Sequence, residues 1–115
     1  MRKLLYVLTA ILLFTGNVAK AEDTLASDKI YFFTKVGCPY CQIAEEHLLK
    51  NHPDLKVEKL YINFPGGWRL FTKCAEKFKL GRNIGTPLFC MDDEYIMGWS
   101  DENQKKFDEL SKKFK

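Results

Sequence analysis

Residues 36–41 read VGCPYC, and they follow the apolar run KIYFFTK at residues 29–35. The run is rich in Ile, aromatic residues and Thr, which is typical of a buried strand. Pro39 suits the first position of a helix, because the N–H group that proline lacks would have no partner there. The next residues, YCQIAEEHLLK at 40–50, carry apolar side chains at helical spacing. The sequence therefore predicts a strand that ends at two cysteines and a helix that begins between them.

The rest of the chain predicts a second strand and helix, then a hairpin and a last helix. The expected elements are LKVEKLYINF (55–64), a helix over 68–80, PLFCM (87–91), EYIMGW (94–99) and a helix capped by Ser100 or Asp101. Pro65-Gly66-Gly67 is expected to break the second strand. The order β-α-β-α-β-β-α begins with a parallel βαβ unit. It predicts one α/β domain with a four-stranded mixed sheet flanked by three helices.

The first 21 residues have the layout of a secretory signal peptide. A basic start precedes an apolar run of 11 residues, Leu4 to Phe14, and Ala19-Lys20-Ala21 matches a small-x-small cleavage site. A membrane anchor is the alternative, but a spanning helix needs roughly 20 apolar residues. We therefore expect cleavage after Ala21, export to the bacterial periplasm, and a mature domain over residues 22–115.

The formal net charge of +3 belongs to this leader. Arg2, Lys3 and Lys20 lie within it, and the remaining chain has 15 basic and 15 acidic side chains. A near-neutral domain gives no electrostatic reason to bind nucleic acid or an anionic membrane. We expect neither as a partner, apart from membrane contact through an uncleaved leader.

The mature chain would hold four cysteines, Cys38, Cys41, Cys74 and Cys90. Thiols tend to pair in an oxidising compartment. A bridge across two residues closes too short a loop to stabilise the fold strongly, which favours a redox role for Cys38 and Cys41. Three readings stay open for Cys74 and Cys90: two buried apolar side chains, a structural disulfide, or a relay to the first pair. A four-cysteine zinc site usually has two CxxC hairpins, and only one is present, so we expect no metal site.

Cys38 is expected to be the more reactive thiol. As the residue that caps the predicted helix, it faces free backbone N–H groups and the positive end of the helix dipole. Both favour the thiolate, so its pKa should fall below the reference of about 8.5. Cys38 would then attack a substrate disulfide, and Cys41 would resolve the mixed disulfide. Lys35 either adds positive charge near this thiolate or is an ordinary solvated lysine.

The Cys-Pro-Tyr-Cys motif between strand and helix resembles the active site of glutaredoxins, within the thioredoxin-fold superfamily. The Lys35-x-x-Cys38 spacing and the element order are also similar, and the resemblance covers residues 30–114. It implies a thioredoxin-like fold, with a nucleophilic first cysteine and a resolving second cysteine. It further implies a cis-proline at Thr86-Pro87 that faces the cysteines and presents backbone to an extended substrate. The substrate-binding residues implied are Lys35, Pro39, Tyr40, Thr86 and Pro87.

Two segments depart from the glutaredoxin pattern. Gly85-Thr86-Pro87 resembles the catalytic domains of periplasmic disulfide isomerases and reductases. Glutaredoxins carry a Gly-Gly pair where this chain has Gly98-Trp99, and Trp99 is expected to block close approach of glutathione to the backbone. A protein disulfide is therefore the favoured substrate, with Tyr40, Trp68 or Trp99 as apolar contacts.

The sequence thus predicts an exported, monomeric thiol–disulfide oxidoreductase, in the reductase or isomerase direction. Its partners would be protein thiol or disulfide substrates and a redox partner, with no cofactor and glutathione at most as a co-substrate. The alternatives are a glutathione-dependent glutaredoxin and a redox-silent thioredoxin-fold binding module. His47 and His52 are expected to be surface or capping residues.

Overall fold

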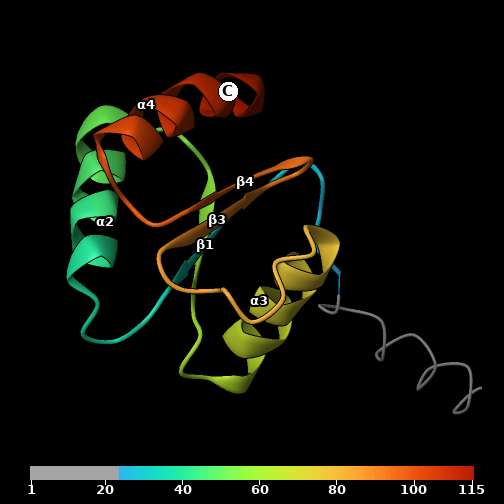
Figure 1. The fold of residues 1–115 in the computed structure, drawn as a ribbon. Coiled ribbons are helices and arrows are strands. Elements are labelled where there is room, and N and C mark those ends of the chain that lie inside the picture. The colour runs from blue at the N-terminus through green and yellow to red at the C-terminus, as the bar shows by residue number, and fades with distance from the viewer. Residues whose placement is uncertain (1–23) are drawn as a thin grey trace, which may run out of the picture.

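A computed structural model describes residues 24–115, which form one sheet with helices on both faces (Figure 1). The strands lie in the order β2-β1-β3-β4. β1 pairs with β2 in parallel, and β1–β3 and β3–β4 are antiparallel. The elements are β1 (Ile30–Thr34), α2 (Pro39–Asn51), β2 (Val57–Tyr61), α3 (Pro65–Lys77), β3 (Leu88–Met91), β4 (Glu94–Met97), α4 (Asp101–Leu110) and the 3-10 helix η1 (Ser111–Phe114). The predicted four-stranded mixed sheet with three helices is confirmed, and this arrangement is a thioredoxin-like fold.

The predicted signal peptide and its cleavage site lie outside the described residues. Within residues 24–115, no helix is long and apolar enough to cross a membrane.

The sheet is buried on both faces. Ile30 and Phe32 of β1 pack on the side of α2 and α4, whereas Tyr31 and Phe33 pack on the side of α3. All five residues of β1 are buried, which explains why the strand reads as a continuous apolar run instead of an alternating one. Figure 1 shows the same layering, with α2 and α4 on one face of the sheet and α3 on the other. β1 therefore forms the centre of the fold, and the loop that holds Cys38 follows its carboxyl end.

The start of α3 differs from the prediction. The second strand, predicted to run to Phe64 and to be broken by Pro65-Gly66-Gly67, already ends at Tyr61. These three residues form the first turn of α3 instead, with proline at the first helical position. A Cβ atom at Gly67 would lie 2.7 Å from the carbonyl carbon of Tyr61, so glycine is required by the close approach of α3 to the end of β2. The helix ends at Lys77, before the predicted boundary, and Lys79 and Gly81 then adopt positive φ angles.

The last helix begins as predicted. The Oγ atom of Ser100 accepts a hydrogen bond of 3.1 Å from the backbone N–H of Asn103, so Ser100 is the N-cap of α4. The acidic residues Asp101 and Glu102 in its first turn complement the helix dipole.

Cys74 of α3 and Cys90 of β3 form a disulfide, with their Cα atoms 6.3 Å apart. Both residues are buried, in the core on the α3 side of the sheet. The structure thus selects the structural disulfide among the three readings of this pair. Cys41 belongs to the core on the opposite side, so the sheet separates the two disulfides and gives no support to a relay between them.

Candidate redox site

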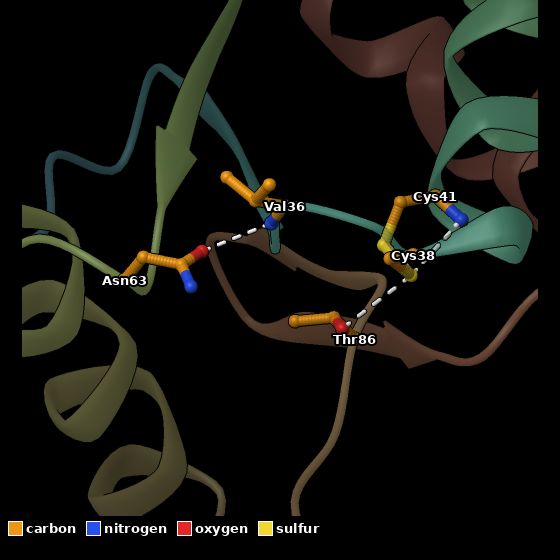
Figure 2. Close-up of a disulfide and its surroundings, with 5 residues drawn as sticks. All are labelled: Val36, Cys38, Cys41, Asn63 and Thr86. Atoms are coloured by element: carbon orange, nitrogen blue, oxygen red, sulfur yellow. Dashed lines mark hydrogen bonds between the residues drawn. A yellow bond between two sulfur atoms is a disulfide. The ribbon is translucent and has the colours of Figure 1, made fainter.

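Cys38 and Cys41 lie at the amino end of α2, directly after the carboxyl end of β1 (Figure 2). Gly37, with a φ angle of +79°, forms the turn that reverses the chain between the two elements. The backbone N–H of Cys38 then donates to the carbonyl of Lys35 across this turn, at 3.2 Å. Cys38 itself is extended, with φ −96° and ψ 106°, and Pro39 follows at the first helical position. These local preferences place Cys38 at the N-cap, as the sequence predicts.

The two cysteines form a disulfide, with their Cα atoms 5.2 Å apart. Their environments differ. Cys38 is partly exposed, whereas Cys41 is only 2% exposed and packs into the core between α2 and the sheet. An incoming sulfur atom can therefore reach Cys38 more readily than Cys41.

The sulfur of Cys38 accepts two hydrogen bonds. One comes from the backbone N–H of Cys41 at 3.2 Å and the other from the hydroxyl of Thr86 at 3.5 Å, and Figure 2 shows both. When the disulfide is reduced, donors aimed at this sulfur stabilise its thiolate, as does the helix dipole. Cys41 receives no hydrogen bond of this kind among the interactions of the described residues. The electrostatics of the site therefore favour Cys38 as the nucleophile.

Thr86 reaches the cysteines because of the loop before β3. The Thr86-Pro87 peptide bond is cis, which confirms the expectation that the resemblance implied. The carbonyl of Pro87 accepts a hydrogen bond of 2.8 Å from the N–H of Gly98, and this bond ties the loop to the end of β4. Pro87 is buried and Thr86 is partly exposed, so the loop is anchored on one side and open on the other.

The remaining predicted substrate-binding residues, Lys35, Pro39 and Tyr40, lie on either side of Cys38 in the sequence. Tyr40 is 60% exposed beside Cys41, and it is available for contact with a bound chain. Lys35 is exposed and lines a pocket with both cysteines, while its carbonyl supports the N–H of Cys38. Pro39 begins the helix. The five predicted substrate-binding residues thus lie in the loop after β1, in the first turn of α2 and in the loop before β3.

The pocket beside the cysteines has a volume of about 190 Å³ and contains a charge pair that sequence reasoning did not find. Glu45 lies one turn after Cys41 on α2, and its carboxylate is 2.5 Å from the ammonium group of Lys59 on β2. The hydrogen bond from Lys59 to Glu45 raises the pKa of that lysine. No spacing in the sequence signals the pair, because it forms only when α2 packs against β2.

Asn63 is a second residue that the sequence did not identify. Its side-chain oxygen accepts a hydrogen bond of 2.9 Å from the N–H of Val36, so the segment after β2 holds the loop that carries the cysteines (Figure 2). Large apolar side chains are exposed on these segments and at the start of α3. This apolar rim consists of Val36, Tyr40, Phe64 and Trp68.

Trp99 does not belong to the rim, and the prediction that it offers a surface contact to the substrate is wrong. It is only 8% exposed and packs in the core, with ring centroids 5.8 Å from Phe89 and 6.1 Å from Phe107. Its indole is therefore not part of the exposed surface around Cys38. Gly98, with a φ angle of +84°, turns the chain so that the next side chain enters the core.

Comparison of the chain with known protein families and with curated proteins finds no match.

Proposed function

We propose that the protein is a thiol–disulfide oxidoreductase of the glutaredoxin-like kind, with Cys38 as nucleophile and Cys41 as resolving cysteine. The observation that carries the proposal is the asymmetry of the pair. Cys38 is partly exposed and its sulfur accepts hydrogen bonds from the Cys41 N–H and the Thr86 hydroxyl, whereas Cys41 is buried. A structural bridge needs no such asymmetry, but a pair that reacts in two ordered steps does.

The first step begins from the reduced protein. The thiolate of Cys38 attacks one sulfur of a substrate disulfide, forming a Cys38–substrate bond and breaking the substrate S–S bond. The second substrate sulfur leaves as a thiolate and takes a proton from solvent. The donors at Cys38 lower the energy of the attacking thiolate, and the partial exposure of this residue admits the substrate.

In the second step Cys41 loses its proton and attacks the sulfur of Cys38. The Cys38–Cys41 disulfide forms, the substrate leaves as a dithiol, and two electrons have passed from the protein to the substrate. Cys41 is buried, so its proton needs an acceptor inside the pocket. Glu45 is the carboxylate among the residues that line this pocket, and it lies one turn along the helix. We assign it as the group that receives this proton.

The substrate class follows from the surroundings of Cys38. The apolar rim offers contact area to a polypeptide, and the open side of Thr86-Pro87 offers backbone to an extended segment. Glutathione is small and carries two carboxylates, so it needs cations and backbone N–H groups more than apolar area. These features favour protein disulfides as substrates. Two disulfides in the described residues are also typical of an oxidising compartment, in keeping with action in the bacterial periplasm.

Turnover of a disulfide-bonded test protein by the reduced protein, with a chemical reductant in excess, tests the proposal. Wild type should reduce the test protein catalytically, and Cys38→Ser should abolish the reaction. Once reduced and then freed of the reductant, Cys41→Ser should accumulate a mixed disulfide between Cys38 and the test protein. A glutathione mixed disulfide serves as the comparison substrate, and its kcat/KM should be lower. Equal activity in Cys38→Ser, or no reaction in wild type, would refute the proposal and favour a redox-silent binding module.

A further inference from the structure

Two histidines and an aspartate meet at the end of α2 opposite the cysteines. His47 Nε2 lies 2.7 Å from Oδ1 of Asp108 on α4, and His52 Nε2 lies 2.6 Å from the same oxygen. One nitrogen of each ring is thus aimed at a single carboxylate oxygen, and the three atoms lie within 4.8 Å of one another. His47 and His52 are nine and fourteen residues beyond Cys38, so the cluster is about 14–21 Å from that cysteine along the helix.

Aromatic packing holds both imidazole rings in place. His47 packs against Trp99 and His52 against Phe107, each with ring centroids 5.5 Å apart. The two imidazoles also contact each other edge-on at 5.5 Å, and their side chains are only 10% and 6% exposed. Asp108 differs, because its side chain is 42% exposed. The cluster therefore has two fixed nitrogen atoms, one carboxylate that is free to adjust, and an open side toward solvent.

The other ring nitrogen of His52, Nδ1, indicates that this histidine serves through the contact made by its Nε2. Nδ1 of His52 is buried and has no hydrogen-bond partner among the described residues. A buried polar atom without a partner costs free energy. An apolar ring would fill the same space beside Phe107 without that cost. A histidine kept only for packing is therefore poorly explained here, whereas a histidine that uses its Nε2, in the hydrogen bond to Asp108 or as a ligand, is well explained.

We propose that His47, His52 and Asp108 bind a divalent transition-metal ion, Zn²⁺ in the first place, through the two Nε2 atoms and a carboxylate oxygen. Imidazole nitrogen and carboxylate oxygen are ligands that Zn²⁺ takes at about 2.0–2.2 Å, commonly in a tetrahedral set. Water completes the set on the exposed side of Asp108. The three side chains come from α2, from its C-cap and from α4, so a bound ion would link these two helices.

Metal binding requires a different arrangement of protons on the two rings. In the metal-free protein the Nε2–H of each ring donates to the Asp108 carboxylate, which can only accept. In the bound state the Nε2 lone pair faces the ion and the proton resides on Nδ1. For His47, the side-chain amide of Asn51 lies 3.0 Å from Nδ1, and its oxygen can accept this proton once the amide is flipped. Such an outer partner fixes the tautomer of a metal-binding histidine.

The test uses the untagged protein in its oxidised form, because the four cysteines are then held in disulfides and offer no thiolate to the ion. Isothermal calorimetry with ZnCl₂ should give a stoichiometry of one, and a tenfold excess should raise Tm. Co²⁺ in place of Zn²⁺ should give the visible absorption of a tetrahedral complex.

Three variants decide the assignment. His52→Phe preserves the packing against Phe107 and should abolish binding while circular dichroism shows a folded protein. Asp108→Asn should weaken binding by at least about tenfold. The matched control is Glu109→Gln, which removes the exposed carboxylate next in the chain and should bind as wild type does. The proposal fails if wild type takes up no stoichiometric Zn²⁺, or if uptake survives both His52→Phe and Asp108→Asn. Neither outcome bears on the redox function, which uses the opposite end of α2.

Discussion

Removal of the Cys74–Cys90 disulfide should cost the fold a large part of its stability. The bond joins α3 to the central part of the sheet and closes a loop with a sequence separation of 16. In the chain-entropy treatment a loop of this size restricts the unfolded chain by about 10 cal/mol/K, which is about 3 kcal/mol at 25 °C. A domain of this length has a total free energy of unfolding of about 5–14 kcal/mol. The bond is therefore a main contribution to the free energy of unfolding.

The measurement is urea unfolding of the variant Cys38→Ser/Cys41→Ala, with and without a reductant. This background leaves one disulfide, so the reductant opens the Cys74–Cys90 bond alone. With a slope of about 1.5 kcal/mol per M, a loss of about 3 kcal/mol lowers the midpoint by about 2 M urea. A loss below about 1 kcal/mol would refute the argument from loop closure. Mass spectrometry under both conditions verifies the state of the bond.

Three further predictions concern single side chains. Gly67→Ala should destabilise the protein by more than about 1 kcal/mol, because the new Cβ would lie 2.7 Å from a backbone carbon of Tyr61. Thermal unfolding measures this loss, and an unchanged Tm would contradict the close approach of α3 and β2. Trp99→Ala should lower the free energy of unfolding by about 3–5 kcal/mol, because it leaves a cavity in the core, and it should not raise activity on glutathione. A selective gain in activity on glutathione would show that Trp99 acts at the substrate site. The hydrogen bond from Lys113 at 2.6 Å lowers the pKa of Asp93, so the contribution of this ion pair to stability is present above about pH 3.9 and is lost as the pH falls through the lowered pKa. In Lys113→Gln, NMR titration should find a higher pKa for Asp93 than in wild type, and an unchanged pKa would exclude the ion pair in solution.

Local signals in the sequence predicted much of the fold and the centre of the site. The run of residues 29–35 and the motif that starts at Cys38 are read from neighbours in the chain, and both lie where the prediction placed them. The same holds for Ser100, because an N-cap depends on the three residues that follow it. The cis bond before Pro87 came from resemblance alone, since the dipeptide itself carries little information about it.

The errors and omissions arise where distant segments meet. Pro65-Gly66-Gly67 has the composition of a break, but Gly67 is glycine because β2 passes close to the first turn of α3. The direction of the Trp99 side chain depends on a core to which α4 contributes Phe107. The pairing of Glu45 with Lys59 depends likewise on packing between α2 and β2.

The histidine cluster shows the same limit. His47 and His52 are five residues apart and show no metal-binding spacing on their own. Their third partner, Asp108, is 56 residues beyond His52 and reaches them only because α4 folds back beside α2 (Figure 1). The sequence therefore suggested surface or capping residues. His52 is indeed the C-cap residue of α2, but both side chains are almost entirely buried.

The central claim is that Cys38 is the thiolate nucleophile of an active redox pair, and alkylation of the reduced protein as a function of pH tests it most directly. Peptide mapping assigns the rate at each pH to individual cysteines, and Thr86→Val removes one donor to the Cys38 sulfur as a matched comparison. We predict that Cys38 reacts first, with a pKa well below the reference of about 8.5 that rises again in Thr86→Val. Faster alkylation of Cys41, or titration of Cys38 above about 8.5, would contradict the account.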